Sequence, residues 1–78
     1  MKFKVLDTVV LDVELPEHGL EKGDVGAVVH VHGPEALEVE FVDGGGHTLA
    51  LVTLVPSQVR SILPTELLSV RSLKKKSA

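Results

Sequence analysis

Four histidines are the side chains of this sequence best suited to binding a metal ion. His30 and His32 are two positions apart in an apolar segment, so a strand would place both on one face, and His47 opens a later segment. Three imidazoles and a water can complete a zinc site. However, the neighbouring residues are leucine, valine and glycine, and the local spacing gathers no carboxylates. We therefore expect solvent-facing strand histidines, with no metal and no cofactor.

Glu17 and His18 are adjacent and form the one candidate acid–base pair. The chain has no cysteine and no tyrosine, and its serines lie far along the sequence, at Ser57, Ser61 and in the C-terminal tail. A nucleophile with an adjacent base is therefore missing from the pattern. The small β-barrel that the strand pattern predicts below also fills its interior with side chains, which leaves little room for a substrate. We expect that the protein is not an enzyme.

The elements that must position these residues are short strands. Turn signals at Pro16, at Gly33-Pro34, at 43–46 and at Pro56 separate apolar segments at intervals of about ten residues. The expected strands cover residues 5–14, 25–32, 37–41, 47–55 and 59–63. This spacing predicts an all-β domain over residues 1–63, a small barrel of about five antiparallel strands. Residues 64–78 are expected to form a basic tail that is disordered, or frayed with a short helix.

Several local patterns predict how the strands sit. Gly23, Asp24 and Gly26 form a glycine-bracketed corner that turns the chain into the second strand. Unbroken alternation over 25–32 places Gly26, Val28, His30 and His32 on one face. Segment 47–55 is apolar on both sides, which predicts a central strand or one covered on both faces. Phe41 is in phase with the expected core residues Leu37 and Val39.

Charge and composition narrow the function further. Residues 1–63 carry ten acidic and four basic side chains, whereas residues 64–78 carry one acidic and four basic. An acidic body is poorly suited to a phosphate backbone, and with only Phe3 and Phe41 the chain lacks an aromatic platform for bases. Neither a secretory signal nor an apolar run long enough to span a membrane is expected. These features, with the absence of cysteine, favour a cytoplasmic protein.

Three stretches carry a resemblance to a known family. They are Leu15 to Leu20 (LPEHGL), Gly23 to Val29 (GDVGAVV) and Glu38 to Asp43 (EVEFVD), with further matches at 6–11 and 48–54. Together they resemble a family of small bacterial proteins of unknown function, over about residues 5–63. The resemblance implies an SH3-like barrel and no activity. Residues 22–29 also have a weaker similarity to the glycine corner of KOW-type barrels.

The remaining candidate is an acidic surface. Its candidate partner-binding residues are Pro16, Glu17, His18, Glu38 and Glu40. Such a surface can steer a basic partner, so we expect a non-enzymatic protein–protein interaction module, such as an accessory or neutralising subunit of a basic protein. The alternative interpretation of these acidic residues is a solvated surface that only keeps the protein soluble. Two alternatives stay open: a KOW-like barrel that binds nucleic acid through the corner and the lysine tail, and a homodimer that buries Val10, Val28 and Val52.

Overall fold

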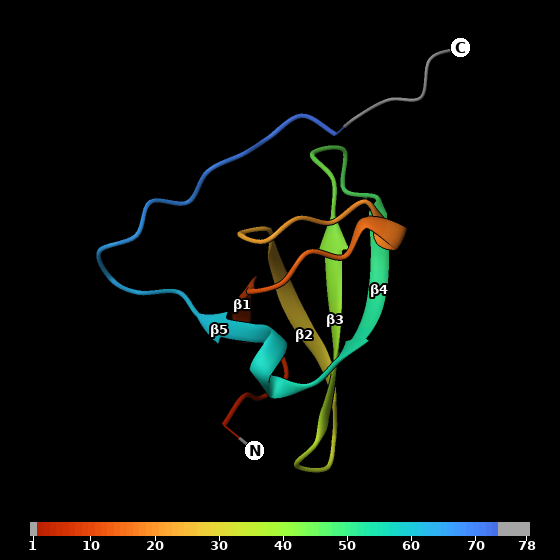
Figure 1. Cartoon of the computed structure of the whole chain (residues 1–78), viewed down its shortest axis with the longest axis vertical. Coiled ribbons are helices and arrows are strands. Elements are labelled where there is room, and N and C mark those ends of the chain that lie inside the picture. Colours follow the sequence, from red (N-terminus) through yellow and green to blue (C-terminus); the bar gives the residue numbers. More distant parts are fainter. Residues whose placement is uncertain (1, 74–78) are drawn as a thin grey trace.

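The computed structural model describes residues 2–73 and shows a single antiparallel sheet (Figure 1). Its strands are β1 (Thr8–Leu11), β2 (Val25–His32), β3 (Ala36–Val42), β4 (Thr48–Leu54) and β5 (Val59–Ser61). Two short 3₁₀ turns interrupt them, η1 (Pro16–His18) and η2 (Pro56–Gln58). Among the described residues there is no α-helix, and no helix long and apolar enough to cross a membrane. The prediction of an all-β domain with about five short antiparallel strands is confirmed.

The sheet has two free edges. Its strand order is β4-β3-β2-β1-β5, so β4 and β5 lie at opposite ends. Within residues 2–73, hydrogen-bonded pairing joins neighbouring strands in this order, and no pairing between β4 and β5 closes the ring. The expected closure into a barrel is therefore not detected. The strongly twisted sheet still wraps around a core, as the very different directions of the β5 and β3 arrows in Figure 1 indicate.

The core lies on one face of this sheet. Every strand contributes to it, and Phe3 and Leu20 pack against the strands from outside the sheet. The buried cluster is Phe3, Val9, Leu11, Leu20, Val28, Leu37, Val39, Phe41, Val52, Leu54 and Val59. The placement of Phe41 in the core is confirmed. Val10 is buried as well, so none of the three valines on which the homodimer alternative rested is exposed on the single chain.

A β-bulge in β2 changes which residues share a face. Val28 pairs with Val39, but the next pair is His30 with Glu38, so Val29 is the extra residue. A bulge of one residue reverses the alternation that follows it. Gly26 and Val28, which precede the bulge, are buried. His30 and His32, which follow it, are consequently turned to the other face and exposed. The prediction that all four share a face was wrong, because the sequence pattern contains no signal for the extra residue.

Strand β4 is an edge strand rather than a central one. It pairs with β3 alone, through register partners such as Glu40 with Leu51. Val52 and Leu54 are buried, while Leu49, Leu51 and Thr53 are exposed. The expectation of a central or doubly covered strand was wrong. Apolar residues on both sides indicated burial on both sides, but here one side covers the core and the other is left to solvent.

The segment after β5 runs away from the sheet and then returns to the body. In Figure 1 it forms a wide arc that starts at β5 and ends beside the upper part of the sheet. Described residues 64–73 form neither a helix nor a strand, so the short helix that was an alternative for this segment is absent from them. Lys74, Lys75 and Lys76 lie outside the described residues. The disorder expected for the tail stays a prediction.

Candidate functional site

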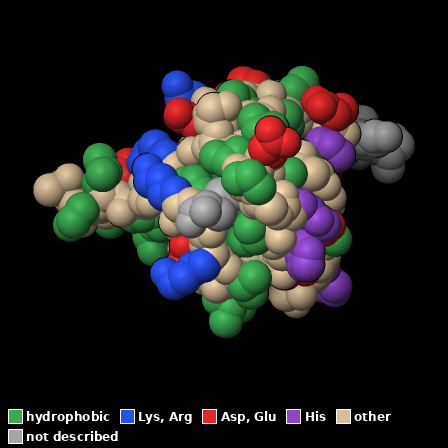
Figure 2. Space-filling view, turned by 90° about the horizontal axis from the view of Figure 1, so that it is seen from below, with side chains coloured by type: hydrophobic (Ala, Val, Ile, Leu, Met, Phe, Trp, Pro, Cys, Tyr) green, Lys and Arg blue, Asp and Glu red, His purple; other side chains and the backbone are tan. Residues whose placement is uncertain are grey.

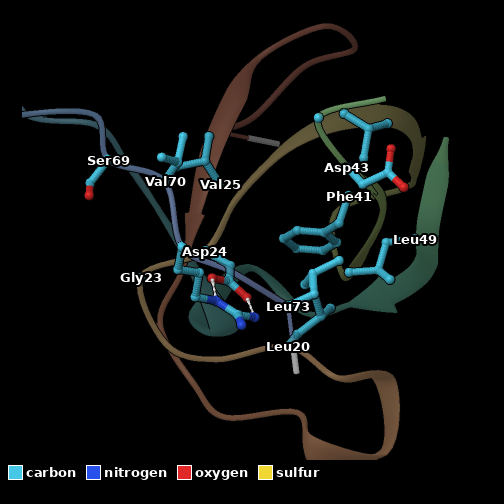
Figure 3. Close-up of a pocket in the computed structure, with 13 residues that line it drawn as sticks. Leu20, Gly23, Asp24, Val25, Phe41, Asp43, Leu49, Ser69, Val70 and Leu73 are labelled. Atoms are coloured by element: carbon cyan, nitrogen blue, oxygen red, sulfur yellow. Dashed lines mark hydrogen bonds and ion pairs between the residues drawn. The ribbon is translucent and has the colours of Figure 1, made fainter. Parts of the chain in front are cut away.

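A hollow of the surface lies between the loop over residues 15–24 and the hairpin that joins β3 to β4. It encloses about 460 Å³, and residues 69–73 of the returning segment form part of its wall (Figure 3). Its lining residues are Leu20, Gly23, Asp24, Val25, Phe41, Val42, Asp43, Gly44, Leu49, Ser69, Val70, Arg71 and Leu73. An adjoining hollow of about 420 Å³ shares Leu20, Leu49, Arg71 and Leu73 with it. We call the two together the tail groove.

The loop that forms one wall is held in a fixed shape. Leu15 and Leu20 exchange backbone hydrogen bonds of 3.0 and 3.1 Å across η1. Gly19 ends this turn in the left-handed region, with φ of +70°. The side chain of Leu20 is buried in the core and thereby ties the loop to the sheet. The loop is consequently a rigid wall whose exposed tip carries Pro16, Glu17 and His18.

The glycine corner positions Asp24 at the edge of the groove. Gly23 has φ of +98°, a backbone conformation that residues with a side chain rarely adopt. Its amide donates a hydrogen bond to the carbonyl oxygen of Leu11 at 2.7 Å. Asp24 Oδ2 accepts a 2.8 Å hydrogen bond from the amide of Glu21, which closes the turn. Gly23 and Asp24 thus lie in the turn that leads into β2. Gly26, however, lies inside β2 and serves close packing against β3 rather than the turn.

The corner also holds a charge that faces the groove. Arg71 Nε donates to Asp24 Oδ1, and Arg71 Nη2 donates to Asp24 Oδ2, both at 2.7 Å. Nη2 also donates to the carbonyl oxygen of Gly19 at 3.0 Å, and Nη1 lies 3.5 Å from Glu21 Oε2. The Asp24 side chain is only 16% exposed. These hydrogen bonds from Arg71 lower the pKa of Asp24, and Asp24 in turn raises the pKa of Arg71.

Leucine and phenylalanine side chains form the floor of the groove, whose lining also includes the acidic residues Asp43 and Glu14. Figure 3 shows the side chains of Leu20, Phe41, Leu49 and Leu73 directed toward one another on the side away from Asp24. Leu49 is the extra residue of a second irregularity, because Phe41 pairs with Ala50 and Val42 with Thr48. The groove thus combines a carboxylate at one end with an aliphatic and aromatic floor at the other. Such a surface can receive a cationic side chain and a large apolar side chain together.

The comparisons with known proteins place this architecture in a family. Residues 5–61 match the family described as "Domain of unknown function (DUF4926)". The chain belongs to this family. No curated protein and no solved structure matches the chain. The DUF4926 match contains the loop, the corner and all five strands, and it ends before the returning segment that carries Arg71.

In this DUF4926 chain the predicted partner-binding residues belong to two elements, with Pro16, Glu17 and His18 in η1 and Glu38 and Glu40 in β3. Of the five, Pro16 alone lines the tail groove. Glu38 and Glu40 lie on β3, where Glu38 Oε2 is 2.6 Å from His32 Nε2 and Glu40 Oε2 accepts a 2.6 Å hydrogen bond from Thr48 Oγ1. A partner-binding role for Glu17, His18, Glu38 and Glu40 stays a prediction.

Sequence reasoning did not select Asp24 or Arg71 as site residues. Asp24 reads in the sequence as part of the corner and as one of several acidic residues around the loop, and Arg71 reads as one of the basic residues of the tail. A signal was nevertheless present: Arg71 stands apart from the lysine run, between Val70 and Leu73. The apolar residues Val70 and Leu73 near this arginine distinguish the segment from the lysine run that follows, because a purely solubilising tail needs no apolar side chains.

The histidines of this DUF4926 chain lie on the surface without forming a metal centre. The rings of His30 and His32 have centroids 4.3 Å apart, and His47 Nδ1 lies 3.3 Å from Asp43 Oδ1. Within residues 2–73, no three potential metal ligands come together. Figure 2 shows histidines gathered on one side of the molecule, with lysine and arginine on the opposite side. The expectation of solvent-facing strand histidines agrees with the exposure of His30 and His32.

Proposed function

We propose that this protein is a non-enzymatic interaction module that binds a basic segment of another protein in the tail groove. The observation that carries the proposal is the paired hydrogen bonding of Asp24 with an arginine beside an apolar floor. A bidentate arginine–carboxylate pair combines charge with a fixed direction, which makes it a specific means of recognition. An accessory or neutralising subunit of a basic protein would use such a groove.

The charge of the body supports the same function. Glu14, Glu21 and Asp24 lie on or beside the groove, and residues 1–63 are strongly acidic as a whole. A field of one sign accelerates the encounter with a partner of opposite sign, while the apolar floor supplies contact area once the partner has docked. The rigid loop wall reduces the ordering that binding would otherwise require.

The two alternative functions receive less support. Phe3 and Phe41 are both buried, so within residues 2–73 no phenylalanine, tyrosine or tryptophan side chain is exposed to stack on a nucleic-acid base. Val10, Val28 and Val52 are buried within one chain, which removes the original argument for a homodimer. The implied relation to SH3-like bacterial barrels belongs to the same proposal. The strand order and the one-sided core support it, although β4 and β5 are not paired.

Affinity capture with matched charge variants tests the groove as the binding site. The full chain is compared with Asp24→Asn and with Glu38→Gln, each of which removes one negative charge, from the groove and from the β3 face respectively. We expect one protein to be recovered by the wild type and by Glu38→Gln and to be lost from Asp24→Asn. Asparagine retains an oxygen to accept the Glu21 amide, so the corner remains closed.

Three results would contradict this function. They are the recovery of no specific protein, a partner whose binding is unaffected by Asp24→Asn, or a partner that Glu38→Gln loses instead. The last result would move the site to the β3 face and restore the surface that the sequence predicted. Circular dichroism and thermal unfolding of each variant separate a lost site from a lost fold.

A further inference from the structure

We infer that residues 69–73 are a built-in competitor for the tail groove, which takes partner segments with an arginine followed two positions later by a leucine. The segment Ser69-Val-Arg-Ser-Leu73 forms one wall of the groove in this structure, and its Arg71 already holds both carboxylate oxygens of Asp24. It would have to leave before the arginine of a partner could pair with Asp24. This inference rests on the proposed function, because it names both the chemistry of the ligand and the device that regulates its access.

The contacts of Arg71 define the cationic end of the ligand. Its guanidinium makes two 2.7 Å hydrogen bonds to Asp24, a third hydrogen bond to the carbonyl of Gly19, and an ion pair with Glu21. Lysine carries a single ammonium and cannot reproduce the two parallel bonds to one carboxylate. The groove should therefore select arginine over lysine at this position.

Leu73 defines the apolar end. Two residues after Arg71, it lines both hollows together with Leu20 and Leu49. Val70 also lines the first hollow, but it is 98% exposed, whereas Leu73 is 38% exposed. An extended backbone directs residues i and i+2 to the same side and the residue between them to the other. The recognised feature is thus the pair of residues 71 and 73, and the residues beside them are free to vary.

Side-chain contacts hold the docked segment, which takes no part in the buried core or in the hydrogen bonding of the sheet. All residues of the buried core lie between Phe3 and Val59, so no part of the segment belongs to the core. Among the described residues, no backbone–backbone hydrogen bond joins 67–73 to the body. Within residues 2–73, the polar attachment of this segment to the body is confined to the contacts of Arg71 with Asp24, Gly19 and Glu21. The segment can consequently leave the groove without disturbing the sheet, as a competitor must.

The connection to the body keeps the competitor close to the groove. The covalent chain supplies the tether, because β5 ends at Ser61, only ten residues before Arg71. The bidentate pair of Arg60 with Glu66, at 2.7 Å for each bond, lies at the start of the arc near β5 and is not part of the docking contact. The intervening Leu67 is 90% exposed, and Leu68 is also exposed. A short tether of this kind gives an effective concentration in the mM range, enough to compete with a weak partner segment and not with a tight one.

A nitroxide label reports directly whether the segment is docked. The chain contains no cysteine, so Ser72→Cys introduces a single attachment site on an exposed residue next to Leu73. We expect the label to broaden the amide signals of Gly19, Gly23 and Leu49 in the full chain. Adding Arg71→Ala should remove the broadening. Adding Arg60→Ala, which breaks the other arginine–carboxylate pair, should leave it in place.

A peptide with the sequence of residues 69–73, acetylated and amidated, tests competition. The affinity of a site falls in proportion to the fraction of molecules in which it is blocked, so a segment docked nine-tenths of the time weakens binding about tenfold. We expect the Arg71→Ala/Leu73→Ala chain to bind the peptide about tenfold more tightly than the wild type or Arg60→Ala. Asp24→Asn should abolish binding, and a peptide with lysine for arginine should bind more weakly to every variant.

The outcomes separate this inference from the function on which it rests. Absence of broadening in the labelled chain, or equal peptide affinity in the wild type and the double variant, would overturn the competitor while leaving the groove as a partner site. Failure of the peptide to bind even the double variant would overturn the ligand assignment. A partner captured independently of Asp24 would overturn the proposed function itself, whatever the position of the tail.

Discussion

Arg71 and Asp24, 47 residues apart in the sequence, are joined by two parallel hydrogen bonds of 2.7 Å. Asp24 at the same time accepts the Glu21 amide that closes the corner before β2. One carboxylate therefore serves a local turn and a long-range contact. This double use explains why a residue that reads as a structural corner in the sequence lies at the centre of the candidate site.

Replacement of Gly26 by alanine should destabilise the sheet. A Cβ at this position would lie 2.7 Å from Val39 Cγ1 and 2.9 Å from Phe41 Cε1, both in the core. Overpacking of this kind costs about 1–3 kcal/mol. Urea unfolding followed by circular dichroism measures the loss. Gly44→Ala is the control, since a Cβ there meets nothing within 4 Å, and an equal effect of the two substitutions would refute the packing argument.

Truncation of Leu37 should remove a large part of the total stability. Leu37 is fully buried in β3, and the Leu→Ala change at such a site costs about 2–5 kcal/mol. A domain of this size begins with only about 5–10 kcal/mol, so the variant should unfold at a much lower temperature. Leu67→Ala makes the same chemical change on a side chain that is 90% exposed, and should leave the melting temperature unchanged.

The carboxyl group of Glu66 should titrate far below its ordinary pKa. The hydrogen bonds from Arg60, helped by the Leu63 amide, lower the pKa of Glu66 from 4.5 to about 2. Because the folded pKa is depressed, the contribution of this pair to stability is present above pH 4.5 and is lost as the pH falls through about 2. Carbon-detected NMR titration of the side-chain carboxyl measures the midpoint.

The matched variant for this titration is Arg60→Ala. It should return the pKa of Glu66 most of the way to 4.5, leaving a residual depression because the Leu63 amide still donates to Glu66 Oε1 at 2.8 Å. A midpoint near 4.5 in the unchanged chain would show that the start of the arc is not held by this pair in solution.

Leu51→Lys should reduce self-association without loss of the fold. Leu51 is exposed on the edge strand β4, and edge strands with exposed apolar side chains promote aggregation. A lysine there would face Glu40, its register partner, and such opposite-charge pairs contribute about 0.2–1 kcal/mol. Light scattering at high protein concentration measures the effect. Thr53→Lys adds the same charge opposite Glu38 without removing a leucine, so equal improvement would assign the effect to charge alone.

The number of strands, their approximate positions and much of the core follow from the sequence by itself. Turn residues and apolar alternation act over a few neighbouring positions. The sequence alone therefore predicts the turn at Gly23, the burial of Phe41 and the alternation of buried and partly exposed residues along β3. The exposure of Glu17 and His18 at the loop tip follows in the same way, because proline and glycine bracket a polar stretch.

The tertiary structure alone decided which surfaces meet. The bulge at Val29 turned the histidines away from the core, and the strand order made β4 an edge although both its sides are apolar. Neither property is local, since a bulge and a strand order depend on which partner strand is adjacent. The pairing of Arg71 with Asp24 is the clearest case. It joins a segment outside the family match to a corner inside it, and only folding brings these two charges together.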